Sequence, residues 1–256
     1  MENMRLGYQA SSVTPYLDTP ENILSSFKKL SEIGYKFIQL QGVPKEIDDT
    51  VIVSALAESG LICVGTQEDY ILGFGDDPDR YIKRALAVGA EYLAFALIPF
   101  ELDTADAIRN FAADKLLPIV RKAEEAGLVF SFHPIGYDYR LIEGMPAYEI
   151  LMESLPESVH LTFCVSACFD SAVRPEEVFE KYGDRMELVH FKDFVKDDEG
   201  KNILMPLGQG LHDWVSYLNS ARKCSVKYIF AEQESWQKDA FECAKDSFDY
   251  LTGIGL

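Results

Sequence analysis

Short apolar segments alternate with longer amphipathic segments along almost the whole chain, and this alternation constrains the fold more than any other feature. The short segments are rich in β-branched and aromatic residues, which is typical of strands. Several of the longer segments end at a glycine directly before the next apolar segment, namely at Gly34, Gly60, Gly89 and Gly127. Because strands that alternate with helices pair in parallel, eight such units in 256 residues predict an α/β fold, a (β/α)8 TIM barrel.

This barrel is expected to form a single domain over residues 1–256. The expected strands cover residues 5–9, 35–42, 61–67, 90–98, 128–133, 159–164, 186–193 and 226–234. The expected helices cover residues 19–34, 45–60, 76–89, 103–127, 145–155, 174–183, 211–224 and 237–251. A doubly wound open sheet is the alternative, but the sequence contains no G-x-G-x-x-G turn of the kind that such sheets use for dinucleotides.

Composition excludes several classes of partner. The formal net charge is −18, which would repel nucleic acid, so we expect no nucleic-acid partner. No apolar run approaches the roughly 20 residues that a membrane span needs, and the start MENMRLGYQASS lacks the basic and apolar regions of a signal peptide. The five cysteines include no C-x-x-C pair and favour free thiols over disulfides. We therefore expect a cytoplasmic enzyme or binding protein without membrane contact.

Four consecutive predicted strands end in a side chain that can bind a metal. They end at His133, Cys164, His190 and Glu232, each after a mostly apolar run. In such barrels the functional site lies at the carboxyl ends of the strands, and equivalent strand positions point to the same side of the sheet. Imidazole, thiolate and carboxylate bind zinc and related divalent ions. We expect these four side chains to converge on a metal at the barrel mouth; the alternative is four unrelated structural roles.

Charged residues continue two of these strands. Lys192 and Glu234 lie two residues beyond His190 and Glu232, so they should point the same way and could reach a substrate. Asp193 should point outward and cap its loop.

Amides and aromatic residues near the other strand ends suggest how a substrate could be held. An amide both donates and accepts hydrogen bonds, which suits hydroxyl recognition. Aromatic loop residues fit the walls of a sugar-sized pocket, although packing alone would also explain them. The amides at or near strand ends are Gln9, Gln39, Gln41 and Gln67. The expected substrate-binding residues of these two kinds are Gln9, Gln41, Gln67, Tyr137 and Trp236.

The segment PLGQGLHDW at 206–214 places two glycines before a predicted helix. Such a segment could hold an anion at the helix start, although no Lys or Arg lies in it. His212 is expected to be a surface residue of that helix.

The sequence resembles the xylose-isomerase-like (β/α)8 barrels, specifically the sugar phosphate isomerase/epimerase group, which shares its fold with a class of apurinic endonucleases. The resemblance runs over nearly the whole chain and is strongest in SEIGYKFIQLQG, EKYGDRMELVHFKD, PLGQG and FAEQE. It implies one divalent metal held by carboxylates on strands five, six and eight and by a histidine on strand seven. His190 and Glu232 match this scheme, whereas Cys164 replaces the strand-six Asp. On strand five, His133 has the better position and Asp138 the familiar carboxylate, so both are candidates.

The thiol of Cys164 affects which metal ion the site would prefer. Loss of a hard carboxylate favours zinc over manganese or magnesium. It is equally compatible with a protein that binds no metal. If Asp138 is not a ligand, it is expected to contact the substrate.

The resemblance implies an isomerase or epimerase that acts on a sugar, sugar phosphate or polyol by proton transfer next to a carbonyl. Glu232 would be a metal ligand and base, His133 would move a proton on the opposite face, and Lys192 would stabilise the oxyanion. The partner would be a small-molecule sugar or polyol, and a homo-oligomer is compatible with the sequence.

Two other functions use the same residues. A lyase or dehydratase would act on a keto-polyol through the same enolate. A metal-free, non-catalytic binding protein would explain Cys164. A nuclease is disfavoured by the acidic charge and by the presence of only four histidines.

Overall fold

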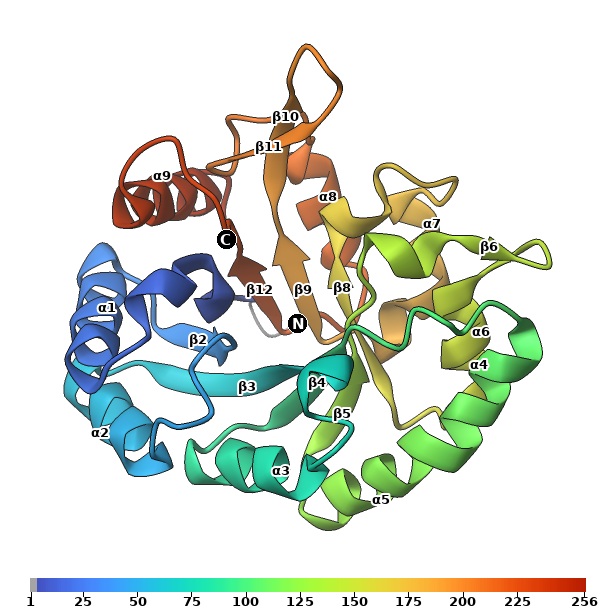
Figure 1. Cartoon of the computed structure of the whole chain (residues 1–256). Helices are drawn as coiled ribbons and strands as arrows, with labels where there is room; N and C mark the ends of the chain where they lie inside the picture. Colours follow the sequence, from blue (N-terminus) through green and yellow to red (C-terminus); the bar gives the residue numbers. More distant parts are fainter. Residues whose placement is uncertain (1–3) are drawn as a thin grey trace.

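Eight parallel strands close into a barrel in the computed structural model, which describes residues 4–256 (Figure 1). The first barrel strand pairs with both the second and the last, which completes the ring. The barrel strands are β1 (Arg5–Gln9), β2 (Phe37–Leu40), β3 (Ile62–Asp69), β4 (Tyr92–Ala96), β5 (Val129–Phe132), β8 (His160–Cys164), β9 (Leu188–Phe191) and β12 (Tyr228–Ala231).

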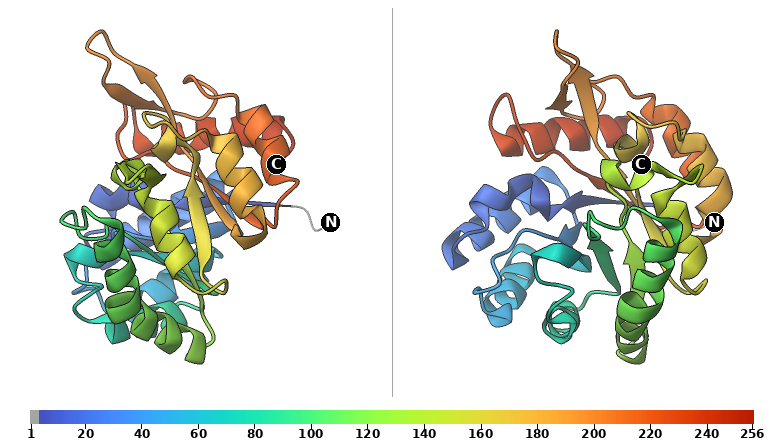
Figure 2. Two further views of the ribbon diagram at one scale, coloured as in Figure 1. Left: turned by 90° about the vertical axis from the view of Figure 1, so that its right-hand side faces the viewer. Right: turned by 45° about the vertical axis from the view of Figure 1, so that its right-hand side comes forward.

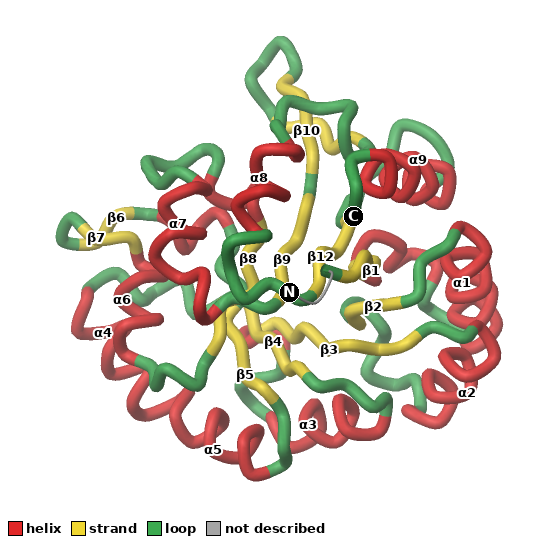
Figure 3. Tube along the Cα trace, turned by 180° about the vertical axis from the view of Figure 1, so that it is seen from behind, coloured by secondary structure: helices red, strands yellow, loops and turns green. Residues whose placement is uncertain are grey.

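Helices surround the barrel on all sides, as the view from behind shows most clearly (Figure 3). They are α1 (Pro20–Ile33), α2 (Asp49–Ser59), α3 (Pro78–Ala87), α4 (Ala105–Phe111), α5 (Leu117–Glu125), α6 (Ala147–Ser154), α7 (Pro175–Tyr182), α8 (Trp214–Ala221) and α9 (Ala240–Gly253). Among residues 4–256, each helix is too short or too polar to span a lipid bilayer. All five cysteines are free.

The predicted (β/α)8 barrel is therefore confirmed, with two differences in detail. The segment 103–127, expected to be one helix, is divided into α4 and α5 by a wide π-helical turn at Ala112–Leu116. Two antiparallel hairpins were not expected: β6 (Leu141–Ile142) with β7 (Met145–Pro146), and β10 (Asp193–Lys196) with β11 (Asn202–Met205). The second hairpin projects beyond the barrel (Figure 2).

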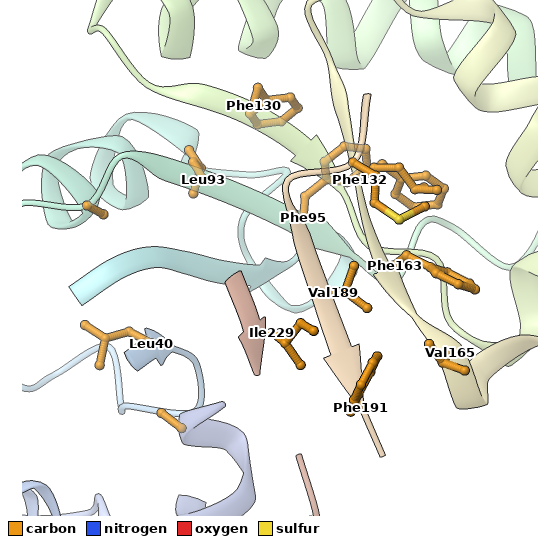
Figure 4. Packing of buried hydrophobic residues seen from close by; sticks show 14 of the residues in the cluster. Leu40, Leu93, Phe95, Phe130, Phe132, Phe163, Val165, Val189, Phe191 and Ile229 are labelled. Carbon is orange, nitrogen blue, oxygen red and sulfur yellow. The ribbon is translucent and has the colours of Figure 1, made fainter. Parts of the chain in front are cut away.

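Alternation along the strands separates an outer and an inner layer of side chains. Outward residues pack against the helices; Phe95 on β4 stacks with Phe130 and Phe132 on β5, at ring-centroid distances of 5.1 and 4.9 Å (Figure 4). Residues of β3, β4, β9 and β12 form a second apolar cluster in the interior that includes Tyr228 and Phe230. The barrel is thus filled by side chains on one side of each strand and sealed against the helices on the other.

The same alternation decides which side chains reach the mouth of the barrel. On β12, Tyr228 and Phe230 point inward, so Glu232, just beyond the strand, points inward as well. Likewise, Leu188 belongs to the inner cluster and His190 follows it on the same face of β9. On β9 and β12, the polar side chains at the mouth therefore lie directly above apolar side chains of the same strand.

A buried carboxylate anchors the loop that follows β9. Asp193 accepts hydrogen bonds from the backbone N–H groups of Gly208 and Gly210, both at 3.0 Å, and from Trp214 Nε1 at 2.9 Å. His212 Nδ1 lies 3.0 Å from the same carboxylate. Burial alone would raise the pKa of Asp193, but these donors lower it below its usual value. Asp193 therefore caps its loop, and the glycine segment that could have held an external anion holds this carboxylate instead.

The expectation that His212 is a surface residue is wrong. Its imidazole is buried and stacks on Trp214 at a ring-centroid distance of 4.9 Å. Nδ1 faces Asp193, and Nε2 lies 3.3 Å from Ser166 Oγ. Ser166 Oγ in turn contacts the backbone carbonyl of Lys192. His212 thus connects the β9 loop to the loop after β8.

The loop after β5 also contains a buried acid. Asp138 lies in a short 3₁₀ turn at Gly136–Tyr139 and is 0% exposed. Its Oδ2 accepts from the backbone N–H of Ile135 at 2.8 Å, whereas its Oδ1 has no hydrogen-bond partner. Burial raises the pKa of Asp138 to about 7.

Replacing the anchoring carboxylate should destabilise the protein. Asp193→Ala leaves buried N–H donors without an acceptor, so we expect a loss of roughly 3 kcal/mol or more in the free energy of unfolding, measured by urea denaturation. The exposed Asp114, substituted as Asp114→Asn, is the control and should change stability by less than about 0.5 kcal/mol. A loss as small as that of the control would contradict the anchoring role.

Asp138 should make stability depend on pH. Its pKa rises from 3.8 to about 7 on folding, so between these values the folded state binds more protons than the unfolded state, and stability falls as pH increases. Asp138→Asn removes the free-energy cost of ionising this buried carboxyl group. The free energy of unfolding of the variant, relative to that of the wild type, should therefore grow between pH 5 and pH 8 by on the order of 2 kcal/mol. Urea denaturation at both pH values measures this gap; a gap that does not change with pH would refute the assignment.

Candidate active site

Three potential metal ligands meet at the mouth of the barrel. His133, His190 and Glu232 each offer one ligand atom, and these atoms lie within 4.8 Å of one another. His133 follows β5, His190 lies in β9 and Glu232 follows β12, and all three are buried. We call these three residues the ligand group.

The orientation of His190 is set by an amide behind it. Its Nε2 lies 2.6 Å from Gln39 Oε1, and because an amide oxygen only accepts, Nε2 carries a proton. Its Nδ1 lies 3.2 Å from Glu232 Oε2. When the imidazole carries its one proton on Nε2, both Nδ1 of His190 and Oε2 of Glu232 are hydrogen-bond acceptors. Two acceptors this close need a cation between them or a second proton on the ring. A partner that fixes the tautomer in this way is typical of metal-binding histidines.

The imidazole of His133 has no partner in the protein. Both ring nitrogens are buried without a hydrogen bond, and the ring centroid lies 4.7 Å from that of His190. Burial, assisted by the neighbouring His190 and Lys192, lowers the pKa of His133 to about 3. A neutral imidazole with a free lone pair, close to a carboxylate, suits metal ligation.

The carboxylate of Glu232 lies between Lys192 and His190. Its Oε1 lies 3.1 Å from Lys192 Nζ, and the same ammonium is 2.6 Å from Glu234 Oε1. Burial would raise the pKa of Glu232, but Lys192 and His190 lower it well below the usual range. Burial would likewise lower the pKa of Lys192, yet Glu232 and Glu234 raise it. At Glu234, burial and the neighbouring Glu232 raise the pKa to about 7.

Cys164 stands beside the ligand group but does not belong to it. Its Sγ lies 3.9 Å from Glu232 Oε2. Burial, followed by the charge of Glu232, raises the pKa of this thiol to about 12. Asp138, the other carboxyl candidate on the strand-five side, also lies outside the ligand group.

Amides cluster on the opposite side of the mouth, at the ends of β1, β2 and β3. Gln41 Oε1 accepts from Gln9 Nε2 at 3.1 Å and from Gln67 Nε2 at 3.0 Å. Gln41 Nε2 faces Asp69 Oδ1 at 3.5 Å. The amide oxygens of Gln9 and Gln67 are buried without a partner. We call Gln9, Gln41 and Gln67 the amide cluster; with its two unpartnered acceptors it could bind hydroxyl groups.

A cleft of about 330 Å³ opens beside the ligand group. It lies between the loops after β5 and β8 and the β10–β11 hairpin. Its lining residues are His133, Ile135, Gly136, Cys164, Ser166, Ala167, Asp170, Lys192, Phe194, Asn202 and Leu204. This volume is at the low end of the range for small-molecule sites.

The predicted aromatic residues lie at different places around this region. Tyr137 packs edge-on against Phe100, and its hydroxyl contacts the Phe100 carbonyl. Trp236 donates from Nε1 to the Gln233 carbonyl at 2.8 Å and packs near Tyr16. Both contacts are structural, and neither residue lines the cleft.

Two features of the site were not predicted from sequence. The first is the contact of Gln39 with His190, which joins residues that are far apart in the chain. The second is the hairpin wall of the cleft, formed by Phe194, Asn202 and Leu204. The inward position of Gln39, two residues before Gln41, is the signal that could have identified it.

The donor set of the ligand group fits a divalent metal. Two imidazoles and one carboxylate compose a known type of catalytic zinc site, in which a fourth position is left for water or substrate. Such an ion would account for one of the two unpartnered nitrogens of His133 and for the facing acceptors of His190 and Glu232.

Comparison with solved structures gives several matches over the whole chain. One is a sugar phosphate isomerase/epimerase from Parabacteroides distasonis ATCC 8503, with a TM-score of 0.83 and 14% identity over 100% of this chain and 96% of that one. The IOLI protein with a binding zinc atom has a TM-score of 0.74 and 14% identity over 98% of each chain. The 3-keto-D-glucoside 4-epimerase YcjR from E. coli has a TM-score of 0.74 and 18% identity over 98% of this chain and 100% of that one.

At these identities the solved structures show a shared fold. Comparison with curated proteins gives no match. A family model described as xylose isomerase-like TIM barrel matches residues 27–251, which is most of the barrel. The closed parallel barrel and this match lead to the same conclusion: the chain belongs to the xylose isomerase-like TIM barrel family.

Proposed function

We propose that the protein is a metal-dependent isomerase or epimerase that moves a proton next to the carbonyl of a sugar or polyol. The observation that carries the proposal is the buried imidazole of His133, which has no partner and faces His190 and Glu232. Structures of similar fold include a zinc-bound protein and an epimerase of a keto sugar, which supports this reading.

His133, His190 and Glu232 would hold the metal, and zinc is favoured because two of the three donors are imidazoles. When bound, such an ion supplies Lewis-acid polarisation of a substrate carbonyl. Cys164 replaces the carboxylate that the family resemblance implies, and its Sγ lies beside the ligand group, 3.9 Å from Glu232 Oε2.

The remaining charged residues have distinct roles in the proposal. Lys192 lines the cleft, so its ammonium would donate a hydrogen bond to the oxyanion that develops as the proton leaves. Glu234 lies 2.6 Å from Lys192 and is not in the ligand group, so its carboxylate would carry the proton. Gln39 would orient His190.

Metal affinity should depend on Gln39. Gln39→Leu removes the acceptor for His190 Nε2, and we expect zinc affinity, measured by competition with a chelating dye, to fall about 10- to 100-fold. Gln41→Leu is the matched control, because Gln41 lies two residues further along and contacts only the amide cluster and Asp69. Equal zinc affinity in the two variants would contradict the proposed metal site.

Substitutions of Glu232 and Glu234 should distinguish zinc binding from proton transfer. Glu232→Gln should weaken both zinc binding and the exchange of substrate protons with deuterated water, followed by NMR on candidate ketoses. Glu234→Gln should leave zinc binding within about threefold while slowing exchange by about 100-fold or more.

Undiminished exchange in the metal-free protein would refute the metal dependence. A product that has lost water would instead assign a dehydratase.

A further inference from the structure

We propose that Ser166, His212 and Asp193 form a nucleophile–base–carboxylate triad that hydrolyses short carboxylic esters in the cleft, because Ser166 Oγ lies 3.3 Å from His212 Nε2 and His212 Nδ1 lies 3.0 Å from Asp193 Oδ1. We call these three residues the triad. A hydroxyl on one ring nitrogen and a carboxylate on the other is the connectivity that activates serine nucleophiles on unrelated folds. The triad shares no residue with the ligand group, so this activity is separate from the proposed metal-dependent proton transfer.

Asp193 fixes the tautomer of His212. A carboxylate only accepts hydrogen bonds, so the ring nitrogen that faces it, Nδ1, carries a proton. The other carboxylate oxygen, Oδ2, accepts from two backbone N–H groups of residues 208–210 and from Trp214 Nε1, and these donors keep Asp193 in place and ionised. The neutral imidazole therefore presents the lone pair of Nε2 to Ser166 Oγ.

The imidazole of His212 is held rigidly and away from water. It stacks on Trp214 at a ring-centroid distance of 4.9 Å with 15° between the planes, and Phe169 and Phe194 pack against it at 4.2 and 4.9 Å. Its side chain is 0% exposed. The ring is therefore held facing the serine hydroxyl, and the carboxylate on its other side stabilises the positive charge that the ring gains when it accepts a proton.

Ser166 brings a hydroxyl group to the cleft. The residue is half-buried and lines the cleft, whereas His212 is buried and does not line it. The hydroxyl contacts two acceptors, His212 Nε2 and the backbone carbonyl of Lys192, but it has one proton to donate. Rotation about the Cβ–Oγ bond moves this proton from the carbonyl to Nε2, which can then abstract it. The nucleophile thus meets the substrate while the base stays buried.

The cleft also supplies a donor for the oxyanion and limits the size of the acyl group. Lys192 lines the cleft, and its ammonium has three N–H donors, of which Glu232 and Glu234 occupy two. The third donor is available to the oxyanion of a tetrahedral intermediate. Phe194 and Leu204 form an apolar wall, and the volume of about 330 Å³ suits a short acyl chain.

The reaction needs only the ester and water. Ser166 Oγ forms a bond to the acyl carbon, the π electrons of the carbonyl move to its oxygen, and His212 Nε2 takes the hydroxyl proton. When the carbonyl forms again, the bond to the alcohol oxygen breaks, and the alcohol leaves with the proton from Nε2. Water then attacks the acyl-serine by the same steps, which releases the carboxylic acid and restores Ser166.

Ester hydrolysis and covalent labelling test the triad in the whole protein. In the presence of a chelator, so that no metal ion contributes, the protein should hydrolyse p-nitrophenyl acetate. A fluorophosphonate probe should label Ser166, as located by peptide mass spectrometry. Ser166→Ala should lose the label and hydrolyse the ester at least about tenfold more slowly. Ser171→Ala is the matched control and should not change the rate, because Ser171 lies in the same loop and donates to the Cys168 carbonyl.

A second pair of variants tests the base without relying on hydrolysis. Ser166→Cys places a thiol beside His212 Nε2, and its alkylation by iodoacetamide at neutral pH should be at least about tenfold faster than that of the thiol introduced by Ser171→Cys. Adding His212→Gln to Ser166→Cys should remove this advantage, while near-UV circular dichroism reports whether the fold is kept. The comparison of the two introduced thiols stands even if the His212 variant does not fold.

Three results would each overturn the proposal: no label at Ser166, equal hydrolysis by Ser166→Ala and the wild type, or equal alkylation of the two introduced thiols. These measurements require neither zinc nor a ketose. The triad can therefore be confirmed when proton exchange on ketoses fails, and it can be overturned when proton exchange succeeds.

Discussion

Closure of the parallel sheet is the constraint on which the site depends. In a closed barrel, every second side chain of each strand must point to the interior. On β12 these positions are apolar below the mouth, at Tyr228 and Phe230. Above them the same strand faces carry His190 and Glu232. The apolar floor excludes water from one side, so each polar group at the mouth needs a partner from the protein or from a ligand.

Electrostatics at the mouth follow from this burial. Glu232 keeps its charge because Lys192 and His190 lie within 3.2 Å of its oxygens. Lys192 keeps its charge for the reciprocal reason. His133, without such a partner, stays neutral. One charged cluster and one free imidazole therefore lie side by side, an arrangement that can bind a cation and stabilise negative charge developing on a neighbouring atom.

The mouth is chemically divided between the two halves of the chain. The later strands contribute charged and metal-binding groups, whereas β1, β2 and β3 contribute amides. The loop after β9 is held in place by Asp193, which places the β10–β11 hairpin over the cleft beside Lys192. The mouth is therefore asymmetric, with amides on one side and charged groups on the other.

The sequence by itself determined the barrel and the strand ends that form its mouth, because residue alternation and glycine-terminated helices are local properties of the chain. It also indicated that His133, His190 and Glu232 point inward. Only the tertiary structure decided that Cys164 stays outside the ligand group. It also decided that Gln39 orients His190, a contact between residues 151 positions apart. Such contacts depend on how strands shift against one another when the barrel closes, and no local pattern encodes that shift.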